Sequence, residues 1–141
     1  MAVNILLTFA SLLLAQFAHA CMPGKNIDVY FPSNSSAVTA SEMLRLGSWM
    51  VDQRLRYPKQ QAIIVSGYVE EREHNAKSLA EMRLHAVTAI LTERGFNQVS
   101  IQEDSGVYRS GDVKNGRRAE ITMLPACPND CCPDHEPIEK R

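Results

Sequence analysis

The chain has 141 residues, with 15 Lys and Arg against 16 Asp and Glu, which gives a formal net charge of −1 at pH 7. A chain of this length forms one domain around one core. Its basic residues are scattered, so no strong positive field draws the protein toward nucleic acid or an anionic membrane surface. We therefore expect no nucleic-acid partner.

The first twenty residues predict a signal peptide, at 1–20. Ile5 to Phe17 is an almost unbroken apolar stretch, and an Ala-x-Ala triplet follows it at 18–20. The stretch is shorter than the about 20 apolar residues that span a bilayer, and small residues in this spacing are what a signal peptidase cleaves after. We expect export, a mature chain that begins at Cys21, and no transmembrane span in it.

Cys21 at the predicted cleavage point leaves a second interpretation open. Bacterial lipoproteins are cut directly before a cysteine that is then lipidated. Their signals usually place Leu or a similar residue three positions before that cysteine, where this chain has Ala18. The sequence therefore favours ordinary cleavage, and an outer-membrane lipoprotein is the alternative.

Two stretches have the period of amphipathic helices. The first begins at a capping box, Thr39 to Glu42, and should end at Tyr57 because Pro58 follows it. The second begins at another capping box, Ser78 to Glu81, and Gly95 is placed to terminate it. The apolar stripe expected on the first helix consists of Met43, Leu44, Leu46, Met50, Val51 and Leu55.

Strand patterns alternate with these helices. Ile27 to Phe31 alternates apolar and polar residues, and Ala62 to Val65 is a short β-branched run typical of a buried central strand. Alternation returns around Val99 and again from Arg118 to Met123, and the Gly- and Ser-rich stretch 105–116 between them predicts a loop. The predicted element order is βαβαββ.

All four cysteines lie at the ends of the mature chain: Cys21, Cys127, Cys131 and Cys132. In an exported protein this placement predicts disulfides that fasten the termini, and four cysteines allow three connectivities. The alternative is a metal site formed by Cys127, Cys131, Cys132 and His135, which an oxidising compartment disfavours. Residues 127–141 form a Cys- and Pro-rich tail without periodicity.

Four short segments stand in order on this predicted framework. They are Gly67-Tyr68-Val69-Glu70, Asn75, the segment Leu79 to Leu84 that contains Arg83, and Gly116 to Glu120. Together they resemble the OmpA-like domain, the periplasmic module of outer-membrane protein A, the peptidoglycan-associated lipoprotein and flagellar motor stator subunits. The resemblance covers about residues 27–124, within a domain that we bound at 21–126.

The resemblance implies a fold and a function. The fold is α+β, a βαβαββ domain with a mixed four-stranded sheet and two helices packed on one face. The function is noncovalent binding of peptidoglycan through diaminopimelate in the stem peptide, which anchors an envelope component to the cell wall. Carried over to this chain, the ligand-binding residues are Glu70, Arg83, Asn75 and Arg118. No cofactor and no metal are implied.

The residue types suit that ligand. Diaminopimelate ends in an ammonium and a carboxylate, so its site needs an acceptor and a donor close together. Glu70 follows a buried strand and can accept from the ammonium, while Arg83 in the next helix can hold the carboxylate through two parallel N–H bonds. In this chain Glu70 stands where the family has Asp, and Val69 where it has Thr.

Each of these candidate ligand residues also has an alternative interpretation as a structural residue. Glu70 and Arg83 can pair with each other, Asn75 is a common loop former, and Arg118 on a strand suits an ion pair. Trp49 is by default a packing residue, and an anchor for a protein partner in the minority view.

Catalysis lacks support. The chain has no nucleophile elbow, no phosphate-binding glycine loop and no pair of zinc-binding histidines. We therefore expect a protein that is not an enzyme. The alternative to a peptidoglycan-binding module is a structural or assembly subunit of an envelope or secretion complex, which docks other envelope proteins and has a degenerate pocket.

Overall fold

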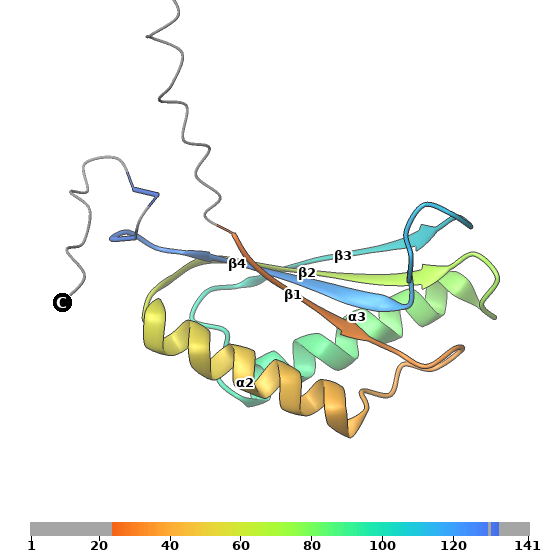
Figure 1. The fold of residues 1–141 in the computed structure, drawn as a ribbon, viewed down its shortest axis with the longest axis horizontal. Coiled ribbons are helices and arrows are strands. Elements are labelled where there is room, and N and C mark those ends of the chain that lie inside the picture. The colour runs from red at the N-terminus through yellow and green to blue at the C-terminus, as the bar shows by residue number, and fades with distance from the viewer. Residues whose placement is uncertain (1–23, 130, 133–141) are drawn as a thin grey trace, which may run out of the picture.

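The computed structural model describes residues 24–129, 131 and 132. The described part forms a four-stranded sheet with two helices, and Figure 1 shows both helices on one face of the sheet. The elements in chain order are β1 (Lys25–Tyr30), α2 (Ala40–Arg56), β2 (Gln60–Glu70), α3 (Ala76–Glu93), β3 (Ile101–Tyr108) and β4 (Arg118–Pro125).

The sheet is mixed, with the strand order β1-β4-β2-β3. β4 lies antiparallel between β1 and β2, whereas β2 and β3 run parallel. The predicted α+β class, the βαβαββ order and the placement of both helices on one face are therefore confirmed. The crossover from β2 to β3 through α3 brings the end of β2 and the end of β3 to the same edge.

Two predicted boundaries are wrong. β3 continues to Tyr108 through residues for which the sequence predicted a loop, because parallel pairing with β2 from Ile63 to Glu70 supplies partners for its backbone groups. α3 begins at Ala76, earlier than the predicted cap at Ser78. Asn75 is its N-cap and has the left-handed backbone conformation, with φ 49°. Asn adopts this conformation more readily than most residues.

The other helix signals are confirmed. The Thr39 side chain accepts a hydrogen bond from the amide of Glu42 at the start of α2, which ends at Arg56 with Tyr57 as its C-cap. Gly95 follows α3 with φ 67°, the left-handed conformation expected of it. Among the described residues no helix is long and apolar enough to cross a membrane.

The core lies between the sheet and the helices. Alternate residues of β4 point into it, among them Ala119, Ile121 and Met123, and α3 contributes Val87 and Leu91. These side chains are at most 1% exposed. The core is therefore built from the strand and helix periods that the sequence displays.

The predicted apolar stripe of α2 does not lie on one face. Leu46 and Met50 are buried against the sheet, whereas Leu44, Val51 and Leu55 are exposed on the other side of the helix. At about 100° per residue these two sets point in opposite directions.

Trp49 packs in the helix layer. Its ring centroid lies 5.3 Å from that of Phe96, and the side chain is partly buried against the core. The packing interpretation of Trp49 is therefore confirmed.

One disulfide joins Cys127 to Cys132, with an S–S distance of 2.05 Å. It closes a turn within the C-terminal segment, so this bridge does not fasten one terminus to the other. Cys131 is also disulfide-bonded, and Cys21 lies outside the described residues. Because Cys127 and Cys132 are bonded to each other, the alternative zinc set is wrong for these two cysteines.

Gly67 lies where α3 approaches β2 closely. A Cβ at this position would collide with the carbonyl oxygen of Ala80 and lie 2.8 Å from the Cβ of Leu84. The Gly67→Ala variant should therefore lose about 1–3 kcal/mol of unfolding free energy, measured by chemical denaturation.

Gly47→Ala is the matched control for that substitution. It adds the same methyl group in α2, where a Cβ would have no neighbour within 4 Å. Because Ala favours a helix over Gly, this variant should gain up to about 1 kcal/mol. An equal effect of the two substitutions would contradict the close approach at Gly67.

Candidate functional site

The candidate site lies where β2 ends and the loop 71–75 leads into α3. β4 begins beside the same end of β2, and β3 ends beside it. The ends of three strands and the start of a helix therefore meet here. The predicted ligand residues Glu70, Asn75, Arg83 and Arg118 all come from these elements.

Arg83 is fully buried beneath this edge, with an exposed fraction of 0%. Its guanidinium makes a two-pronged ion pair with Glu73, in which Nη1 donates to Oε2 at 2.7 Å and Nη2 to Oε1 at 2.6 Å. The remaining donors reach the backbone oxygens of Ser35 at 2.9 Å, Tyr68 at 3.0 Å and Pro32 at 3.2 Å. An Arg side chain has five N–H donors, so all of them are used within the chain.

Glu73 is the acid that the sequence reasoning missed. Besides the two bonds from Arg83, its carboxylate accepts from the backbone amides of Asn34 at 2.8 Å and of Glu70 at 3.0 Å. Burial by itself would raise the pKa of Glu73, but the hydrogen bonds from Arg83 and from these amides outweigh it, so the pKa lies below its ordinary value. Glu73 is therefore a charged carboxylate in the interior.

The pair between Glu70 and Arg83, considered from the sequence as a structural alternative, is not formed; Glu73 takes that place. The sequence does carry a signal for a buried partner. Arg83 stands midway between Leu79 and Val87 at spacings of four, so it lies on the core side of α3. A charge on that side needs an opposite charge beside it.

Glu70 instead faces outward, beside Arg117, the residue directly before β4. Its Oε2 lies 3.7 Å from Nη1 of Arg117, and the two side chains are 38% and 35% exposed. The other carboxylate oxygen of Glu70 accepts from the amide of Gly116 at 3.1 Å. The Arg117 guanidinium donates no hydrogen bond to any residue in the described part of the chain, and its Nε is buried without a partner there.

Glu70 also lines a cavity of about 220 Å³ at this edge. The volume suits the end of one side chain rather than a larger ligand. The other lining residues come from the loop after β2 and from the end of β3 and the loop that follows it: Glu71, Arg72, Tyr108, Arg109, Ser110, Gly111, Val113 and Lys114.

Arg118 is engaged within the sheet. Its Nε donates to Glu120 at 2.8 Å, and its guanidinium lies 3.7 Å from the carboxylate of Asp28 and 3.3 Å from the hydroxyl of Tyr108. Burial works against the charged form, but the bonds to Glu120 and Tyr108 and the charge of Asp28 raise the pKa of Arg118 above its ordinary value. The interpretation of Arg118 as a residue of structural ion pairs is confirmed.

Asn75 is exposed at the beginning of α3, where its side chain makes no capping hydrogen bond. It borders a shallow hollow together with Ala76, Lys77, Ser78 and Glu81. Of these predicted ligand residues, Glu70 and Asn75 therefore reach the surface, whereas Arg83 lies in the core.

These features define a class of protein: an α+β domain whose mixed sheet ends in a cluster of charged side chains. No family model matches the sequence, and no curated protein matches it. Several solved structures match the fold, and we describe three of them.

The OmpA-like domain of FopA1 from Francisella tularensis is 17% identical, with 72% of this chain and 73% of that chain covered and a TM-score of 0.52. The cell wall anchor of the T6SS from Pseudomonas aeruginosa is 16% identical, with 84% and 94% covered and a TM-score of 0.57. The peptidoglycan-associated lipoprotein from Burkholderia pseudomallei is 19% identical, with 68% and 88% covered and a TM-score of 0.50. The chain therefore has the OmpA-like fold, as the resemblance of its motifs implied.

Removing the acid of the buried pair should destabilise the fold strongly. In the Glu73→Gln variant the Arg83 guanidinium stays buried without an opposite charge, so we expect a loss of about 3–5 kcal/mol in the free energy of unfolding. Chemical denaturation at pH 7 measures it. Glu81→Gln, an exposed acid on the same helix, is the control and should change by less than about 0.5 kcal/mol.

The same carboxylate makes stability depend on acid pH. Because the pKa of Glu73 is lower in the folded chain than in the unfolded chain, Glu73 contributes its full stability above the unfolded value near 4. This contribution is lost as the pH falls through the folded-state pKa. A series of denaturation curves from about pH 6 to pH 2 should show a shallower decline for Glu73→Gln than for the wild type, and equal slopes would contradict the assignment.

Proposed function

We propose that this domain binds peptidoglycan noncovalently through the diaminopimelate of the stem peptide, in the Gram-negative periplasm, and so anchors an envelope component to the cell wall. Two of the matching structures support the proposal by their names, one a cell wall anchor and one a peptidoglycan-associated lipoprotein. Export rests on the predicted signal peptide, which lies outside the described residues.

The observation that carries the proposal is the loose pair of Glu70 and Arg117. The 3.7 Å between their charged atoms is longer than a hydrogen bond, and both side chains are about one third exposed. Within the described residues the Arg117 guanidinium donates no hydrogen bond, although its Nε is buried. An incoming zwitterion can satisfy both groups better than they satisfy each other. Its ammonium would meet Glu70 and its carboxylate would meet the guanidinium of Arg117.

Arg83 has a different part in this proposal from the one that the sequence suggested. Since all five of its donors are used, a ligand carboxylate would reach it only by displacing Glu73. We therefore assign Arg83 the role of holding the site together. Glu73 connects it to Glu70, because the amide of Glu70 donates to the Glu73 carboxylate.

Asn75 and Arg118 flank the proposed site. Asn75 has an exposed side chain at the start of α3, where helix amides carry partial positive charge. Arg118 already binds three groups of the sheet, so its contribution to an anionic ligand would be long-range charge. No role in the proposal is catalytic.

A structural or assembly subunit is the second candidate. The observation in its favour is the closed state of Arg83, which lacks a free donor for a ligand carboxylate. In this case the fold docks another envelope protein and does not bind the cell wall.

Sedimentation with isolated peptidoglycan tests the first candidate. The mature protein should pellet with peptidoglycan that contains diaminopimelate, and Arg117→Ala or Glu70→Gln should reduce binding about tenfold or more, since hydrogen bonds between charged groups contribute about 1.5–3 kcal/mol. Arg56→Ala, an exposed arginine of α2, is the matched control and should bind like the wild type.

Peptidoglycan with lysine in place of diaminopimelate sharpens the test. Lysine keeps the ammonium and lacks the carboxylate, so binding to it should be weaker and insensitive to Arg117→Ala. Wild-type protein that stays in the supernatant with both polymers would overturn the proposal and favour the assembly subunit.

A further inference from the structure

α2 is apolar on two opposite sides. Its inner side buries Leu46 and Met50, while on its outer side Leu44 is 74%, Val51 55% and Leu55 81% exposed. The spacings of seven and four place these three residues on one stripe, which we call the outer stripe. On the surface of a monomeric protein this side of a helix is ordinarily polar.

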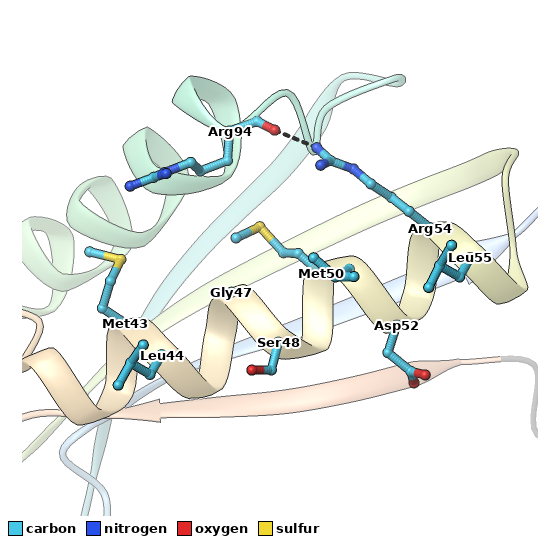
Figure 2. A pocket seen from close by; sticks show the side chains of 10 residues that line it. Met43, Leu44, Gly47, Ser48, Met50, Asp52, Arg54, Leu55 and Arg94 are labelled. Atoms are coloured by element: carbon cyan, nitrogen blue, oxygen red, sulfur yellow. Dashed lines mark hydrogen bonds between the residues drawn. The ribbon is translucent and has the colours of Figure 1, made fainter.

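The outer stripe borders a groove of about 750 Å³ between α2 and the end of α3 (Figure 2). Met43 and Met50 lie along it, and Arg54 reaches across one end to the backbone oxygen of Arg94. The middle of the groove is open at Gly47, where an added Cβ would have no neighbour within 4 Å. The outer side of α2 therefore presents both large apolar side chains and a hollow to the solvent.

We propose that a second copy of this chain covers the outer stripe, with the two α2 helices packed antiparallel. The two ends of the stripe are both leucines, Leu44 and Leu55, so an antiparallel pair can bring the same residue type together at each end. In an antiparallel pair that places Leu44 of one copy opposite Leu55 of the other, Val51 falls opposite Ser48, and the same contacts repeat across a twofold axis. The large apolar side chains then meet apolar or small ones.

The charges beside the stripe fit the same arrangement. Arg45 and Asp52 are seven residues apart, so they lie on one edge of the helix, and their side chains are 49% and 47% exposed. In the antiparallel pair Arg45 of one copy comes within two positions of Asp52 in the other, which is about 3 Å along the axis. Arg45 now pairs with Glu42 at 3.2 Å and Asp52 with Arg56 at 2.8 Å, both near the surface, and in the dimer two further pairs would add to these by symmetry. A net charge of −1 per chain causes little repulsion.

The expected dimer is weak. α2 has 17 residues and is about 25 Å long, and one face of such a helix offers less than the about 800 Å² per partner of a stable interface. We expect a dissociation constant on the order of 10–100 µM. The proposal is independent of peptidoglycan binding, because the outer stripe lies on α2, whereas Glu70 ends β2 and Arg117 directly precedes β4.

Sedimentation equilibrium of the mature protein tests this proposal. Between about 5 and 500 µM the average mass should rise from one chain toward two, and the Leu44→Glu/Leu55→Glu double variant should keep the mass of one chain. Met82→Glu places the same charge on another exposed apolar residue, in α3, and should dimerise like the wild type. Thermal unfolding confirms that each variant is folded.

Charge reversal tests the antiparallel arrangement. Arg45→Glu alone should weaken the dimer about fivefold, and adding Asp52→Arg should restore it, because the reversed pairs again meet across the axis. A single-chain mass at 500 µM, a dimer that survives Leu44→Glu/Leu55→Glu, or a lack of restoration in the reversed pair would overturn the proposal.

Discussion

The buried ion pair of Arg83 and Glu73 is the interaction on which the rest of this structure depends. It connects α3 to the end of β2, to the loop that follows β2, and to the segment after β1, whose backbone supplies Pro32 and Ser35 as acceptors. A charge placed in the interior is tolerated only when its donors are satisfied and an opposite charge lies beside it. The four segments must therefore assemble together, since removing any one leaves a buried donor or acceptor unpaired.

This constraint determines which groups at the end of the sheet can meet a ligand. The Glu73 carboxylate accepts hydrogen bonds both from the Arg83 guanidinium and from the backbone amide of Glu70. The backbone of Glu70 is thus anchored in the interior while its side chain faces outward toward Arg117. The accessible arginine at this edge is therefore Arg117, directly before β4, whereas Arg83 of α3 is buried. In the proposed function, Glu70 and Arg117 would together meet the two charges of a zwitterion.

Period and capping signals predicted the fold because strand alternation and helical spacing are local properties of the chain. The buried strand 62–65, the cap at Thr39 and the terminating Gly95 all follow from neighbours a few residues away. The partner of Arg83 could not be predicted in this way, since Glu73 lies in a loop without period and its orientation depends on β1, β2 and α3 at once. The extension of β3 to Tyr108 has the same origin: pairing with β2 outweighs a composition that indicates a loop.

Helix α2 shows the limit of reading one apolar pattern as one buried face. The six residues of the predicted apolar stripe were enough to predict the helix, yet Leu46 and Met50 are buried in the core while the outer stripe is exposed. The two proposals combine in a specific way. Under the proposed function a cavity of about 220 Å³ would hold only the end of one side chain, so a single site would bind weakly. Two sites joined through α2 would engage a polymer of repeating stem peptides together, and their effective concentration raises the overall affinity without any new contact.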